Sequence, residues 1–211
     1  MTFDGPTDRT DRTDPAARLD PQAREILDFW FGAPGSATFG RARKIWFNGG
    51  AAFDDLLRTR YGALHDAACD GACDHWAGTP RGALALIVVL DQFSRNIHRG
   101  TPRAFAADPR ALALARRVVA AGWDAQLPSG HHRAFVYLPF EHDESEQSQC
   151  EAVRLCAGIR DEAGCRGYHG HALRHAAVIR RFGRFPHRNA ILGRVSSDEE
   201  VAFLRERGAS F

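Results

Sequence analysis

The segment TPRGALALIVVLDQFSRNI, residues 79–97, decides the predicted fold. Thr79 followed by Pro80 is typical of a helix start, because threonine caps the first turn and proline fits its first position. From Ala83 to Leu90 the segment is apolar without interruption. A helix that is apolar all round is normally buried by other elements. We therefore expect this helix to lie in the middle of the molecule.

Helical spacing of apolar residues, broken by Pro and Gly, continues on both sides of this segment. Alternating apolar and polar residues, which would indicate strands, are scarce. Asp108 is expected to cap the helix that follows it, and Pro139 to kink or end its own helix. The sequence predicts an all-α fold of stacked antiparallel helices. The other helices are expected at about residues 21–31, 53–64, 109–121, 129–139, 146–163, 167–182 and 197–204, with a short apolar patch at 45–47.

The length of 211 residues fits one domain, which we assign to residues 20–211. Residues 1–19 contain almost nothing apolar, so we expect a disordered tail there. The 28 basic and 26 acidic residues give a formal net charge of +2. This near balance argues against nucleic acid as the partner, since polyanion binders usually carry a basic excess.

The uninterrupted apolar run at residues 83–90 is far shorter than the roughly 20 residues of a membrane-spanning helix. We therefore expect no membrane partner. The N-terminus lacks the charged and then apolar pattern of a secretory signal. The 5 cysteines, an odd number spread along the chain, do not indicate a disulfide framework. These features predict a cytoplasmic protein.

Asp91 falls on the same helix face as the apolar residues Leu84, Ile87 and Val88. A carboxylate on a face that points to the core must be paired or hydrogen-bonded. Arg95, one helical turn later, can supply that partner. The pair is either a structural ion pair that ties the helix end to the next loop, or one wall of a charged pocket.

Histidines stand beside possible partners in two further segments. His142 and Glu144, just after Pro139, could be an acid–base pair, two metal ligands, or an exposed acidic turn around one histidine. His171 and His175 have the spacing of paired zinc ligands, but no third ligand is evident nearby. We assign no metal ligand from the sequence.

Residues 180–194 are rich in cations, with 5 arginines around a Gly-Pro turn that also carries two phenylalanines. Three interpretations are open: nucleic-acid binding, a buried loop whose arginines pair with Asp91, Glu141 or Glu144, and a pocket for a small anion. By count these carboxylates do not neutralise every arginine of the region. We therefore expect a surplus of positive charge at this place.

Five segments of the chain carry a resemblance: ILDFWFG at 26–32, KIWFNGG at 44–50, LDQFSRNIHRGTPRAFAADPRAL at 90–112, FVYLPFEHDES at 135–145 and RFGRFPHRNAILGR at 181–194. These segments resemble the bacterial domain-of-unknown-function family 924. The resemblance covers about residues 22–207 and implies a helical, tetratricopeptide-like fold, but no established reaction. Two residues depart from the family's usual pattern: Ser94 stands in place of proline, and His98 in place of tyrosine or tryptophan. The acidic motif also differs, because the usual Met-His-Ser-Glu reads Glu-His-Asp-Glu at 141–144.

We interpret these polar residues as a cleft that binds a small anionic ligand and carries out acid–base chemistry on it. Arginines would hold the anion. His142, oriented by Glu144, would be the catalytic proton carrier, because imidazole titrates near neutral pH. The residues assigned to ligand binding are Asp91, Arg95, Asn96, His175, Arg184, His187 and Arg188, of which the three arginines would contact the anion.

The alternative is a tetratricopeptide-like interaction module that binds a peptide or protein along a concave helical surface. A closed pocket that holds most of the assigned residues favours the ligand-binding interpretation. An open groove with exposed aromatic side chains such as Trp30 or Trp46, and with the assigned residues paired with one another, favours the interaction module. No cofactor follows from the sequence, which also leaves open whether the protein is an enzyme.

Overall fold

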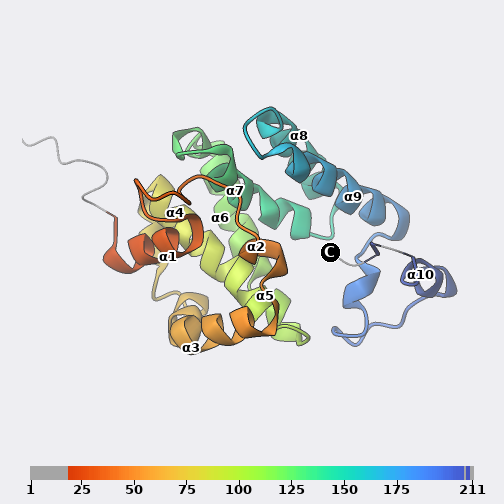
Figure 1. The fold of residues 1–211 in the computed structure, drawn as a ribbon. Coiled ribbons are helices and arrows are strands. Elements are labelled where there is room, and N and C mark those ends of the chain that lie inside the picture. Colours follow the sequence, from red (N-terminus) through yellow and green to blue (C-terminus); the bar gives the residue numbers. More distant parts are fainter. Residues whose placement is uncertain (1–18, 207, 210–211) are drawn as a thin grey trace, which may run out of the picture.

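The computed structural model describes residues 19–206 and 208–209, and within this part every regular element is helical (Figure 1). The all-α class is confirmed. The predicted disordered tail, residues 1–19, lies outside the described residues except for Leu19, which is buried. The stacked antiparallel, tetratricopeptide-like arrangement and the single-domain assignment to residues 20–211 stay predictions.

The segment at 79–97 forms one continuous helical run in the centre of the molecule (Figure 1). It consists of α4 (Pro80–Ile87), a π-helical stretch η3 (Val88–Phe93) and α5 (Ser94–Ile97). The hydroxyl of Thr79 accepts a hydrogen bond from the Gly82 amide at 3.1 Å, as expected of a cap. All residues from 82 to 94 are buried, which confirms the predicted central position.

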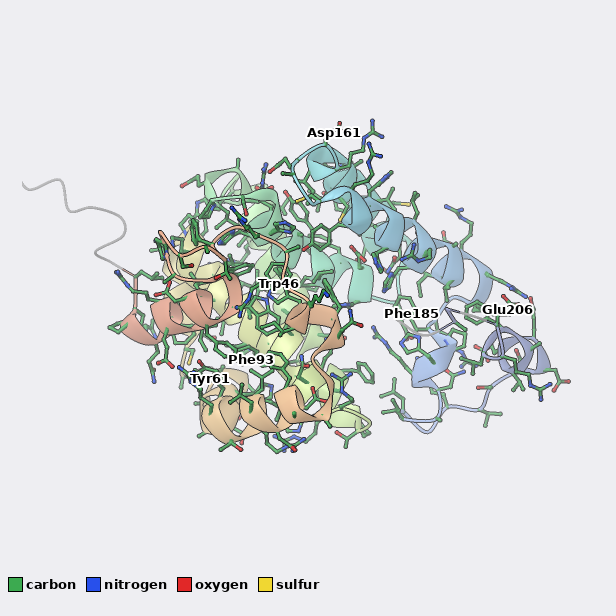
Figure 2. The ribbon with its side chains drawn as sticks, viewed as in Figure 1. Trp46, Tyr61, Phe93, Asp161, Phe185 and Glu206 are labelled. Atoms are coloured by element: carbon green, nitrogen blue, oxygen red, sulfur yellow. The ribbon has the colours of Figure 1, made fainter. Side chains whose placement is uncertain are left out.

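Aromatic side chains join the N-terminal helices to this central run. The helices are α1 (Pro21–Phe31), α2 (Ile45–Asn48) and α3 (Gly50–Cys69). Trp30 lies 5.6 Å from Phe93 and 5.7 Å from Phe135 between ring centres, and Trp46 lies 4.9 Å from Phe135. Trp46 and Phe93 both lie in the interior (Figure 2). Ring pairs at these separations add to the gain from apolar burial.

The C-terminal half continues with α6 (Asp108–Ala120), α7 (Gly130–His142), α8 (Glu146–Ile159) and α9 (Arg166–Phe182). Helices α7, α8 and α9 pack in succession, and α8 and α9 lie side by side at the edge of the molecule (Figure 1). Gly183 ends α9 in the left-handed conformation, at φ 69°. The last helix, α10 (Asp198–Phe203), begins with a capping box between Ser197 and Glu200.

Of the two outcomes predicted for Pro139, a kink or a helix end, the second is wrong, because α7 continues to His142 with the proline inside it. The side chain of Gln149 stabilises this helix end by donating to the carbonyls of Glu141 and Asp143, both at 2.7 Å, and to that of Phe140 at 3.3 Å. The last carbonyl oxygens of a helix have no hydrogen-bond donor within the helix, and the Gln149 side chain supplies that donor here.

Asp108 is not the cap of α6. Ala107 occupies the cap position of that helix, which has no capping hydrogen bond from a side chain. Asp108 is the first residue of α6, and its carboxylate binds Arg95 instead. Separately, no helix in residues 19–206 and 208–209 is long and apolar enough to cross a membrane.

Replacing Gln149 with Met should destabilise the fold, because the buried carbonyls at the end of α7 then lose their donor. Loss of such a partner costs about 1–3 kcal/mol. Urea unfolding of the variant and the wild type measures the difference. Gln147→Met is the matched control, since Gln147 is exposed on the same helix. Equal losses in the two variants would contradict the helix-capping role of Gln149.

Candidate functional site

Asp91 is the centre of a polar network inside the apolar core. It lies in the π-helical stretch η3 and is fully buried. Gln92 Nε2 donates to Oδ2 at 2.6 Å, while His142 Nδ1 and Arg95 Nη1 lie 2.6 and 3.0 Å from Oδ1. Burial alone would raise the pKa of Asp91, but Arg95 and His142 hold it well below its usual range. The predicted Asp91–Arg95 contact is confirmed, and the carboxylate stays ionised.

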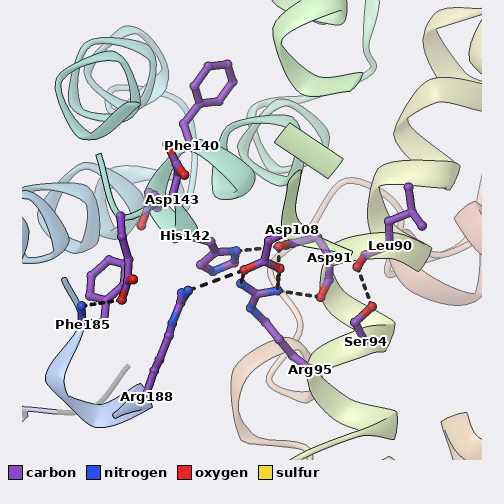
Figure 3. Close-up of polar contacts among 12 residues, drawn as sticks. Leu90, Asp91, Ser94, Arg95, Asp108, Phe140, His142, Asp143, Phe185 and Arg188 are labelled. Carbon is purple, nitrogen blue, oxygen red and sulfur yellow. Dashed lines mark hydrogen bonds and ion pairs between the residues drawn. The ribbon is translucent and has the colours of Figure 1, made fainter. Parts of the chain in front are cut away.

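Arg95 joins this carboxylate to a second one. Its Nη1 and Nη2 donate to the two carboxylate oxygens of Asp108 at 2.8 and 2.9 Å (Figure 3). Such a two-pronged pair is among the strongest ionic hydrogen-bonding geometries in proteins. Sequence analysis missed Asp108 as a member of the site. Its only signal was an Asp-Pro pair at a helix start, which is also the pattern of an ordinary cap.

Arg188 lies at the far end of the network, at the last position of the short helical turn η6 (Pro186–Arg188). The residue is only 6% exposed. Its guanidinium carbon lies 4.6 Å from the ring centres of both Phe105 and Phe185. Its Nη1 is 3.6 Å from Asp108 Oδ2, which is too far for a hydrogen bond (Figure 3).

The hydrogen-bonding capacity of Arg188 is therefore incompletely used. Within the described part of the chain, its buried Nε has no hydrogen-bond partner. Burial, followed by the charge of Arg95, lowers the pKa of Arg188 to about 10. The side chain remains charged at neutral pH. Two aromatic faces and a distant carboxylate thus hold a buried cation.

His142 is the last residue of α7, and Asp91 fixes the orientation of its ring. With Nδ1–H donating to Asp91, Nε2 carries the free lone pair and can accept a proton. Burial and the charge of Arg95 lower the pKa of His142, against the opposing effect of Asp91. The imidazole is accordingly neutral near pH 7. We expected Glu144 to orient this ring; the hydrogen-bonded carboxylate belongs to Asp91 instead.

Glu144 holds the arginine-rich turn. Its oxygens accept hydrogen bonds from Arg194 Nη1 and Nη2 at 2.6 and 2.9 Å, and from the Phe185 amide at 2.7 Å. Burial would raise the pKa of Glu144, but the bond from Arg194 lowers it overall. Glu144 is directed at this turn because its loop follows the end of α7, opposite residues 185–194. Glu144 therefore holds the turn at residues 185–194 in place, and it does not hydrogen-bond to His142.

Three assigned residues, Arg184, Asn96 and His187, have hydrogen-bond or ring partners among residues other than Asp91, Arg95 and Arg188. Arg184 donates to both oxygens of Glu200, at 2.6 and 2.8 Å. Asn96 donates to the Gln92 carbonyl at 2.8 Å, within its own helical run. His187 packs its ring 5.6 Å from that of Phe185, and burial lowers its pKa to about 4. Of the three predicted anion-binding arginines, only Arg95 and Arg188 lie together.

His175 faces a second buried acid, Glu141. Its Nδ1 is 2.9 Å from the His171 carbonyl and 3.5 Å from Glu141 Oε2. Burial lowers the pKa of His175 to about 3. Burial also raises the pKa of Glu141 to about 8, with a further increase from the charge of Asp91, so this acid is protonated at pH 7. Because His175 Nδ1 donates its proton to the His171 carbonyl, this nitrogen has no free lone pair to bind a metal ion.

The arginines that were counted for the expected surplus, Arg95, Arg184, Arg188 and Arg194, each face at least one carboxylate. Asp108 and Glu200, which the count from the sequence omitted, contribute two further negative charges. The balanced residues are the carboxylates of Asp91, Asp108, Glu144 and Glu200 and the guanidiniums of Arg95, Arg184, Arg188 and Arg194.

Glu141 should make the protein less stable as the pH rises from the ordinary glutamate pKa of about 4.5 to its folded-state pKa of about 8. Its folded-state pKa of about 8 lies above that of the unfolded chain, so the stability from its protonated form is lost on the way up. The slope attributable to one such group is about −1.4 kcal/mol per pH unit. Urea unfolding at several pH values measures it.

The variant Glu141→Gln should remove this component of the slope, because glutamine imitates the neutral acid. Glu146→Gln, which changes an exposed carboxylate on α8, should keep the wild-type slope. Identical slopes in wild type and Glu141→Gln would show that Glu141 is ionised in the folded protein.

Comparison with known proteins places the chain in a family. No curated protein matches it significantly. A solved structure of a protein of unknown function from Agrobacterium tumefaciens is similar, with 38% sequence identity, a TM-score of 0.76, and coverage of 91% of this chain and 99% of that one. Residues 26–208 match the family described as bacterial protein of unknown function (DUF924). The resemblance seen in the sequence is confirmed, and the chain belongs to this family of bacterial proteins.

Proposed function

We propose that the network between His142 and Arg188 binds a small anionic ligand, such as a phosphate or carboxylate, and carries out acid–base chemistry on it. The observation that carries this proposal is the state of Arg188. A guanidinium has five N–H donors, and burying them without acceptors is costly. In Arg188 the Nε lacks an acceptor among the described residues, and the nearest carboxylate oxygen is 3.6 Å away.

An anion with two oxygens would complete this side chain. Carboxylate and phosphate match the planar fork of arginine, and a buried pair of this kind gains from the low local dielectric. Phe105 and Phe185 hold the guanidinium flat, which reduces the entropy lost when it binds. Two hollows in the described part of the chain lie beside Leu19 and beside Arg116, away from this network. At Arg188 the ligand would take the place of the loose contact with Asp108.

His142 is the proton carrier in this proposal. Asp91 holds its ring through Nδ1, as a carboxylate orients the general base of a catalytic triad. Its neutral form near pH 7 can take a proton from a bound ligand, and the ionised Asp91 then stabilises the imidazolium. Glu144 takes part as a positioning residue through the turn that carries Arg188. No cofactor is assigned to this site.

The interaction-module alternative, with a peptide or protein as partner, receives mixed support. Within the described part of the chain, only Asp91, Arg95 and His142 among the assigned residues form ion pairs with one another, and the others pair with residues outside the assigned set. The second requirement was an open groove with exposed aromatic side chains such as Trp30 or Trp46. Both tryptophans are buried, at 0% and 4% exposed, although Phe47 is 59% exposed. Because the paired residues and the two tryptophans do not match the interaction module, the anion site is the better supported function.

Phosphate, sulfate or a small carboxylate at millimolar concentration should raise the melting temperature. Binding to the native state at ten times the Kd adds about 1.4 kcal/mol, which corresponds to a rise of about 3–6 °C for a domain of this size. Arg188→Gln should abolish the rise because it removes the fork. Thermal unfolding followed by circular dichroism measures both effects.

Arg180→Gln is the matched control, because Arg180 is exposed on the same stretch of chain and should leave the rise intact. Arg188→Lys should keep the fold and the positive charge but lose most of the rise in melting temperature, since lysine cannot donate to two oxygens of one anion as the arginine fork does. Absence of any stabilisation of the wild type, or its persistence in Arg188→Gln, would reject the proposal.

A further inference from the structure

We propose that His65, Asp66 and His98 bind a divalent transition-metal ion of the zinc class, at a site separate from the Asp91 network. Each residue offers one ligand atom, and the three atoms lie within 4.8 Å of one another. Two imidazole nitrogens and one carboxylate oxygen are a donor set that zinc and its neighbours favour.

The first donor is a buried and unsatisfied imidazole nitrogen. His65 is 2% exposed, and its Nδ1 has no hydrogen-bond partner among the described residues. Its other nitrogen, Nε2, lies 2.7 Å from the hydroxyl of Ser94, which donates onward to the Leu90 carbonyl at 2.6 Å. Because the hydroxyl proton is used, Ser94 accepts from Nε2–H. This bond fixes the tautomer in which Nδ1 carries a free lone pair.

The second donor has the same character. The Nε2 atom of His98 is buried and lacks a hydrogen-bond partner within the described part of the chain. The rings of His65 and His98 are 5.1 Å apart between centres. Burial lowers the pKa of both histidines, so both are neutral at pH 7, as metal binding requires. Two buried nitrogens without hydrogen bonds are costly, and one cation would satisfy both.

Asp66 completes the set from the solvent side. Its Oδ1 lies 3.7 Å from His65 Nδ1, and its side chain is 58% exposed. Zinc lies about 2 Å from each ligand, so two ligands of one ion are at most about 4 Å apart. The His65 and Asp66 ligand atoms already lie within this limit. The distances from the His98 ligand atom to the other two are at most 4.8 Å, so they must shorten by up to about 1 Å when the ion binds. A fourth position would face solvent and hold water.

Two arginines bring positive charge to this site. Arg103 Nη2 donates to Asp66 Oδ1 at 2.8 Å, and Arg58 binds the Ile97 carbonyl at 3.2 and 3.3 Å beside His98. The Arg103–Asp66 pair is exposed on both sides, so breaking it costs little. The metal competes with Arg103 for the carboxylate. This competition provides a test that a purely structural cluster would not pass.

The experiment is a titration of metal-free, full-length protein with Zn²⁺, repeated with Co²⁺ to record visible absorption. One equivalent should bind, and Co²⁺ should give the bands of a nitrogen–oxygen site. Asp66→Asn and His98→Phe should each weaken Zn²⁺ binding by about tenfold or more, and Ser94→Ala by about tenfold through the freed His65 ring. Arg103→Ala should strengthen Zn²⁺ binding, because the competing cation is gone.

Two controls isolate this site. His75→Ala removes an exposed histidine that pairs with Asp20, and it should leave Zn²⁺ affinity unchanged. Arg188→Gln should also leave it unchanged, so the outcome is independent of the proposed anion site. The proposal is overturned if no stoichiometric Zn²⁺ binds, if binding persists in both Asp66→Asn and His98→Phe, or if Arg103→Ala weakens it. Circular dichroism of each variant confirms that the fold is retained.

Discussion

The buried carboxylate of Asp91 is the constraint on which the surrounding structure depends. An ionised group in an apolar core is tolerated only when charges and hydrogen bonds compensate its lost hydration. Here the compensation comes from Gln92, Arg95 and His142. Because His142 ends α7 and Arg95 also binds the first residue of α6, one carboxylate fixes the relative positions of three helical segments. Removing any partner would leave a buried charge incompletely satisfied.

The π-helical stretch makes this arrangement possible. A stretch with π-type hydrogen bonding changes the direction of the side chains that follow it, and such stretches often occur at functional positions. Asp91 lies within η3, and Arg95 follows in α5. The two side chains thus meet each other and also the neighbouring helices. The same stretch of chain carries Ser94, whose hydroxyl faces the other way, toward His65.

One helical run therefore contributes to two polar clusters. On one side Asp91 and Arg95 form the network with Asp108 and Arg188. On the other side Ser94 orients His65 beside His98.

The sequence by itself determined the class of fold and most helix boundaries. The apolar run after Thr79, the Gly183 stop and the capping box at Ser197 are local signals, and local signals depend only on neighbours within a turn or two. They located the central helix, the last residue of α9 and the first residue of α10. The sequence also indicated that Asp91 needs a partner and that Arg95 can provide it, because both lie on one helix.

Only the tertiary structure decided which distant residues meet. Asp108 had the local pattern of a cap, yet the approach of Arg95 across the helix packing gave its carboxylate a stronger partner. Glu144 is close to His142 in sequence but points to Arg194, since the chain turns after α7. His65 and His98 come from separate helical segments, so no spacing rule could join them. These contacts follow from how helices pack, and that packing is set by the whole core.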